Sequence, residues 1–111
     1  MSEKTWLEKQ LLKRLQQERD EVAPIIDQVV DNVEEGIQQH REASYTSISQ
    51  KAYRAITKTP AIEAFFYASL EEYDIPRGWV EVQPGSGHGG GYPTVKVGLT
   101  QLPDISLSDI D

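Results

Sequence analysis

The feature that most constrains the fold of this chain is a change in the spacing of its apolar residues around Ile75-Pro76. Before this point apolar side chains recur every three or four residues, which is the period of amphipathic helices. After it, residues 79–83 and 94–99 alternate apolar and polar side chains, as half-buried β-strands do. The sequence therefore predicts an α+β fold in which helices come first and a C-terminal β-hairpin packs on them.

The first part of the helical region is expected to form a helical hairpin. Thr5-Trp6-Leu7-Glu8 has the form of a capping box, and the helix that it begins is predicted to run to about Val22. Pro24 lacks the N–H that a helix interior needs but suits a first turn, so a second helix is expected to begin there. Two amphipathic helices joined by a short link normally pack antiparallel. One long helix kinked at Pro24 is the alternative.

Two shorter helices are expected next. Residues 43–47 are predicted to be a loop that ends in Ser47 as the N-cap of the third helix. Thr59-Pro60 then ends this helix and begins a fourth, because the Thr59 hydroxyl can cap it and proline suits the first helical position. Phe65-Phe66-Tyr67 in the fourth helix is the densest aromatic group, and we expect it at the centre of the core.

The length of 111 residues fits a single domain. Residues 1–100 are expected to form it, and residues 101–111 an acidic-apolar C-terminal tail. The sequence has no cysteine, which excludes disulfides, zinc–thiolate sites and thiol nucleophiles. Because no apolar run is long enough to span a membrane and the N-terminus does not have the form of a signal peptide, a cytoplasmic location without membrane contact is expected.

The net charge is −7 and is unevenly distributed along the chain. Residues 23–43 and 60–75 each sum to −4, whereas residues 44–59 sum to +3. An acidic chain is unsuited to general nucleic-acid binding, which needs many cations to neutralise phosphates. It suits a soluble protein or one that attracts a basic partner.

Four carboxylates at helical spacing form the first candidate partner-binding surface, the acidic face. They lie opposite the apolar stripe of the predicted second helix. They are Asp27, Asp31, Glu34 and Glu35. Regularly spaced carboxylates can imitate a row of phosphates, so an inhibitor of a nucleic-acid-handling protein, of the kind that mobile elements encode, is one interpretation. A merely solvated helix face is the other.

The basic patch of Lys51, Arg54 and Lys58 is the second candidate surface. Three cations suit a modest contact with phosphate, so a weak nucleic-acid binder is an alternative function. The same cations could equally pair with the acidic helices of the molecule, which is the interpretation we favour from the sequence.

The glycine-rich segment at 85–91 is the third candidate. Gly85 to Gly90 satisfies the pattern G-x-G-x-x-G, but dinucleotide binding needs a helix after the pattern and here a strand is predicted. Gly87, His88 and Gly89 are therefore expected to act as a flexible partner-binding loop or simply as a hairpin tip. A small enzyme or nucleotide-binding module centred on this loop is the alternative.

No catalytic residue and no metal or cofactor site is expected, because neither histidine has a carboxylate or second histidine at a metal-binding spacing. The sequence predicts a non-enzymatic, small acidic protein that acts through protein–protein contacts. An adaptor, an assembly component or an inhibitor would each fit. The expected partner is another protein with a basic surface, and a homodimer is a second option.

Overall fold

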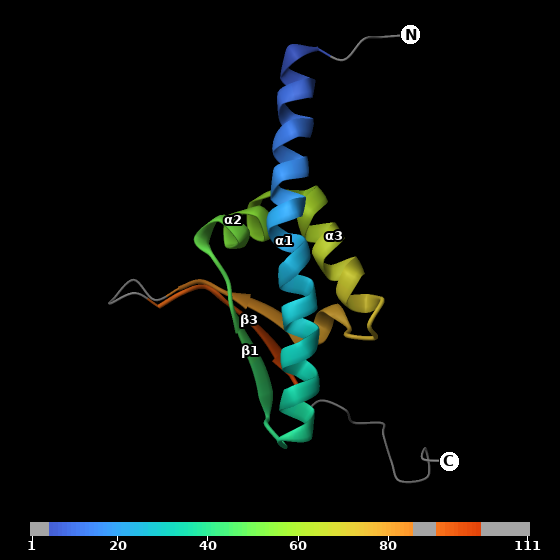
Figure 1. Ribbon diagram of the computed structural model, residues 1–111, viewed down its shortest axis with the longest axis vertical. Helices are drawn as coiled ribbons and strands as arrows, with labels where there is room; N and C mark the ends of the chain where they lie inside the picture. The colour runs from blue at the N-terminus through green and yellow to red at the C-terminus, as the bar shows by residue number, and fades with distance from the viewer. Residues whose placement is uncertain (1–4, 86–90, 101–111) are drawn as a thin grey trace.

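The computed structural model describes residues 5–85 and 91–100, and these form an α+β fold as the sequence predicted (Figure 1). The elements follow in the order α1 (Trp6–Gln38), β1 (Ala43–Ser47), α2 (Gln50–Lys58), α3 (Pro60–Glu71), a short 3-10 helix η1 (Arg77–Trp79), β2 (Val80–Gln83) and β3 (Thr94–Gly98). Helix α1 packs against α2, α3 and β1.

The predicted β-hairpin is confirmed, because β2 and β3 pair antiparallel with Val82 opposite Val95. The sheet has a third strand, however. Strand β1 pairs antiparallel with the other side of β3 and gives the order β1-β3-β2. The inward face of the sheet carries alternate residues of each strand, and on β3 these are the fully buried Val95 and Val97.

Strand β1 contradicts the expectation of a loop at residues 43–47. Its inward residues are Ser44 and Thr46, so the segment lacks the apolar alternation that marks a strand. Asn32 of α1 satisfies Thr46, because its Nδ2 donates a 2.8 Å hydrogen bond to the buried Thr46 Oγ1. The buried Ser44 Oγ has no hydrogen-bond partner among the described residues. Ser47 ends β1, and Ser49 caps α2 by accepting from the Ala52 N–H at 3.1 Å.

The prediction of an N-terminal helical hairpin is wrong. The structure shows the alternative, one helix that continues through Pro24. Proline inside a helix costs about 3 kcal/mol, in part because it leaves the carbonyl four residues earlier without its donor. Pro24 itself is exposed, whereas Val22, Ile26 and Val29 are buried in the core. Each such burial stabilises by roughly 1.5–3 kcal/mol, which is enough to offset the proline.

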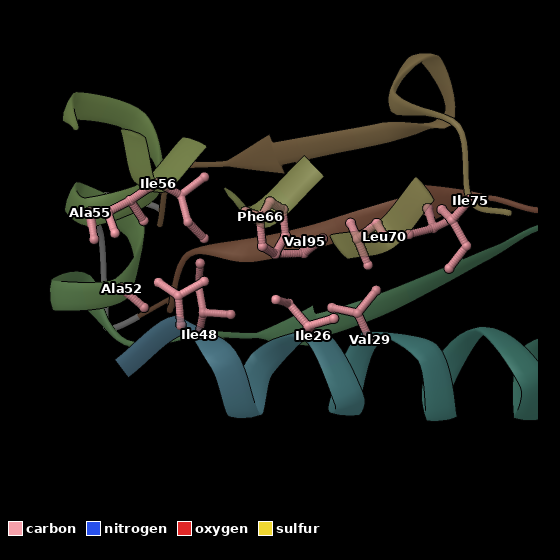
Figure 2. Packing of buried hydrophobic residues seen from close by; sticks show 13 residues of the cluster. Ile26, Val29, Ile48, Ala52, Ala55, Ile56, Phe66, Leu70, Ile75 and Val95 are labelled. Carbon is pink, nitrogen blue, oxygen red and sulfur yellow. The ribbon is translucent and has the colours of Figure 1, made fainter. Parts of the chain in front are cut away.

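The core lies where α1, α2, α3 and the sheet meet (Figure 2). Phe66, from the predicted aromatic centre, is fully buried, while its neighbours Phe65 and Tyr67 are only partly buried. Figure 2 shows Ile26 and Val29 of α1 pointing toward the region of Phe66, Leu70 and Val95.

Helices α1 and α3 both end in a Schellman motif with a non-glycine residue in the left-handed conformation. His40 has φ 58° and Asp74 has φ 62°. After α3, the N–H groups of Ile75 and Asp74 donate to the carbonyls of Leu70 and Glu71, respectively. Ile75 and Leu70 are both buried, which gives the apolar contact typical of this motif.

We expect Asp74→Gly to raise the free energy of unfolding by about 1 kcal/mol, because the left-handed conformation costs a residue with a Cβ roughly 1–2 kcal/mol. Chemical denaturation followed by circular dichroism measures the change. Glu34→Gly, in the middle of a helix, is the control and should lower stability by about 0.5–1 kcal/mol. Equal destabilisation by both substitutions would contradict the role assigned to Asp74.

Candidate functional site

The first part of α1 projects beyond the rest of the molecule (Figure 1). We call residues 6–21 the arm. The first fully buried side chain of the helix is Val22, and the apolar line that it begins continues outward through Leu15, Leu11 and Leu7 at spacings of four and seven. Leu7 is 59% exposed and Leu11 42% exposed. The arm therefore presents an apolar helix face with no covering element among the described residues.

An apolar groove runs beside this face, between the arm and α3. Its volume is about 480 Å³. Leu12 and Leu15 line one wall, and Ile62 and Phe65 the other. Arg19 borders the groove with its guanidinium carbon 5.3 Å from the centre of the Phe65 ring, a cation–π contact.

A basic cleft lies between the arm and α2, with a volume of about 540 Å³. The three cations predicted from the sequence, Lys51, Arg54 and Lys58, line it together with Arg14 of the arm. The sequence did not single out Arg14, because it lies 37 residues before Lys51 and only the packing of α2 on α1 brings them together.

The pairing of these cations with the acidic helices, which the sequence favoured, is not what the structure shows. Among the described residues, Lys51, Arg54 and Lys58 have no carboxylate within ion-pair distance. Arg14 pairs with Glu18, Nε to Oε1, at 3.4 Å, and Glu18 is the one carboxylate among the residues that line the cleft.

Thr59 adds a neutral polar group to the basic cleft. It was expected to cap α3 with its hydroxyl, but its side chain makes no cap hydrogen bond there. Its carbonyl instead accepts from the N–H groups of Ile62 and Glu63, each at 2.9 Å. The side chain is 9% exposed and lines the cleft.

The acidic face is present as a surface. Its residues Asp27, Asp31, Glu34 and Glu35 are all exposed on α1. Glu35 accepts a 2.9 Å hydrogen bond from the Gln39 side chain. The face lies along the part of α1 that packs on the domain, whereas the basic cleft lies beside the arm, so the two charged surfaces occupy different stretches of the same helix.

The glycine-rich segment connects β2 to β3, so no helix follows it in the described chain. Gly87, His88 and Gly89, the predicted loop contacts, lie outside the described residues, as does the tail at 101–111. At the base of the segment, a Cβ on Gly85 would collide with the carbonyl oxygen of Gly91. The backbones of Gly85 and Gly91 thus approach closely, which requires glycine at position 85.

Tyr67 of α3 is partly buried and lies beside two charged side chains, and these surroundings shift its pKa. Burial raises its pKa above 10.0, Arg77 opposes this and Glu63 adds to it. The Arg77 guanidinium carbon lies 4.3 Å from the centre of the Tyr67 ring, and Nη2 of Arg77 contacts Glu63 Oε1 at 2.8 Å. This cluster ties η1 to α3 and offers no nucleophile or base arrangement beyond that structural role.

Comparison with known proteins finds no matching family model, no matching curated protein and no matching solved structure. Within residues 5–85 and 91–100, no helix combines the length and the apolar character needed to cross a membrane. The same residues contain no group of three or more histidine, aspartate or glutamate side chains placed to hold a metal ion.

We expect Arg77→Leu to raise the pKa of Tyr67 further, because the substitution removes the cation that lowers it. The phenol absorbance of each protein is titrated and compared with its Tyr67→Phe counterpart, with Arg41→Leu as the control. Since the unfolded phenol loses its proton first, the stability that Tyr67 contributes is complete below pH 10.0 and decreases as the pH rises through the folded pKa. A lower pKa in Arg77→Leu would contradict the assignment.

Proposed function

We propose that this chain is a non-enzymatic binding protein that acts through protein–protein contacts, with the arm as its main contact surface and a second copy of the chain as the occupant of that surface. The observation that carries the proposal is the exposed apolar line on the arm. Leu15 continues the apolar line of the core and packs partly against it, whereas Leu7 and Leu11 extend this line outward with exposed side chains.

The energetics of the helix favour a partner for the arm. The arm spans about 24 Å at 1.5 Å per residue. Isolated helices of about this length are marginal in water, and most helix stability in proteins comes from packing an apolar face. Leu7 and Leu11 also leave apolar surface exposed to water. Burying this surface against a partner would stabilise the complex by about 25 cal/mol per Å².

The distribution of charge on the arm indicates which partner binds it. The arm carries four cations and four carboxylates, so all of the net charge of −7 lies elsewhere in the chain. Two arms therefore meet without net repulsion. Residues 6–14 hold three of the cations and one carboxylate, whereas residues 15–21 hold one cation and three carboxylates. An antiparallel pair of arms places opposite charges next to each other, which favours that orientation.

A homodimer through the arm would leave the acidic face available for other contacts. The acidic face is a candidate surface for a basic partner, in keeping with an adaptor or assembly component. Its contribution to binding stays a prediction from the sequence.

We expect the wild-type chain to dimerise and Leu11→Glu to be monomeric, because a buried unpaired carboxylate at the centre of the arm pair is strongly unfavourable. Sedimentation equilibrium over a range of concentrations measures this. Ile37→Glu is the matched control, since Ile37 is 52% exposed on the same helix but far from the arm, and it should dimerise normally. Circular dichroism checks that each variant folds. A wild type that stays monomeric up to about 1 mM, where even a weak dimer would be populated, would rule out the second copy as occupant.

A charge exchange tests the orientation. Lys9→Glu/Lys13→Glu and Asp20→Lys/Glu21→Lys should each weaken self-association, because each gives the two halves of the arm a net charge of the same sign. Mixing the two variants should restore dimers that contain one copy of each. If neither variant weakens self-association, the antiparallel arrangement is wrong, because in a parallel pair the halves of like charge already face each other.

A further inference from the structure

The basic cleft is the place where the described chain departs most from its overall charge. Lys51, Arg54 and Lys58 follow one another at spacings of three and four on α2, which places them on one face of that helix. Arg14 adds a fourth cation from α1. Glu18 is the single lining carboxylate, so the cleft is strongly positive in a chain of net charge −7.

The positive charge of α2 stabilises no ion pair among the described residues. Like charges at helical spacing repel by a few tenths of a kcal/mol per pair, so the arrangement weakens α2 slightly. Lys51, Arg54 and Lys58 contact no described carboxylate that would offset this repulsion. An anion in the cleft would offset it.

The neutral groups of the cleft indicate which anion fits. Thr59 is nine-tenths buried, its hydroxyl makes no cap hydrogen bond to α3, and Gln50 also lines the cleft. Phosphate groups offer several oxygens that accept from cations and from neutral donors at once, and the planar guanidinium of arginine matches two of them. The cleft offers the donors that phosphate oxygens accept from: two guanidinium groups, two ammonium groups and a hydroxyl.

We propose that the cleft between α1 and α2 binds phosphate groups, supplied either by a small phosphorylated molecule or by the backbone of a single-stranded nucleic acid. Arg14, Arg54 and the two lysines provide the charge, and Thr59 provides the fixed neutral donor. Glu18 holds Arg14 from the side through its 3.4 Å ion pair. The site borders the apolar line of the arm, because Arg14 follows Leu7 by seven residues on the same side of α1. All of its lining residues come from one copy of the chain.

The test uses the full chain and two probes, a fluorescently labelled oligothymidylate followed by anisotropy and inorganic pyrophosphate followed by NMR chemical shifts. Oligothymidylate affinity should fall about 20- to 50-fold between 50 and 200 mM salt if three or four phosphates are neutralised. Binding of both probes, with pyrophosphate displacing the oligonucleotide, supports a phosphate site that nucleic acid can occupy. Binding of pyrophosphate alone supports a small phosphorylated ligand.

Matched variants separate the site from general charge. Lys51→Gln/Arg54→Gln/Lys58→Gln should weaken binding at least tenfold. Arg41→Gln/Arg77→Gln/Lys96→Gln removes the same charge outside the arm and the cleft and should change it less than twofold. Thr59→Val keeps the charge and should weaken binding about threefold to tenfold through the lost hydrogen bond. Circular dichroism confirms that each variant folds.

Three results would overturn the proposal. The first is no binding of either probe at 50 mM salt. The second is an equal loss in the two triple variants, which would show general attraction and no site. The third is tighter binding of polyglutamate than of oligothymidylate, which would assign the cleft to carboxylates.

Discussion

The fold depends on the packing of the middle of α1 against α3 and the sheet. Val22 and Val29 are fully buried, and Ile26 nearly so. This contact keeps the helix continuous through Pro24, because the apolar burial outweighs the lost hydrogen bond. It also sets the direction of the whole helix, so that the residues before Val22 leave the domain as a rigid extension (Figure 1). The projecting arm and the clefts on its two sides thus follow from one buried stretch.

The sequence predicted most of the fold where local pattern and tertiary packing agree. The helical and strand periods on either side of Ile75-Pro76 gave the α+β class and the β-hairpin. The sequence-based prediction was wrong at Pro24, where local propensity favours a helix break but burial keeps the helix continuous. It was also wrong at residues 43–47, because the inward Ser44 and Thr46 lack the apolar alternation by which a strand is recognised. Neither error could be avoided from periodicity alone, since both depend on contacts with distant elements: the core in one case, β3 and Asn32 in the other.

The candidate surfaces were predicted unevenly for the same reason. Helical spacing was sufficient to place the acidic face and the three cations of α2, because these belong to single elements. The addition of Arg14 and Thr59 to the cleft required the packing of α2 on α1 and the actual capping of α3. The exposure of Leu7 and Leu11 also could not be anticipated, since an apolar stripe looks the same whether or not something covers it.

The continuity of α1 has a consequence for how the length of this chain can vary. Each residue added to a helix turns what precedes it by about 100° and moves it by about 1.5 Å. Inserting two residues between Leu15 and Val22 would swing the outer leucines to the opposite side of the domain. Inserting seven would return them to within about 20° of their present direction, only farther out. Changes of length in this part of α1 are therefore compatible with the present surface only when the added residues complete nearly whole turns, as about seven, eleven or eighteen do. The helix thus fixes both the direction and the distance at which the outer leucines lie.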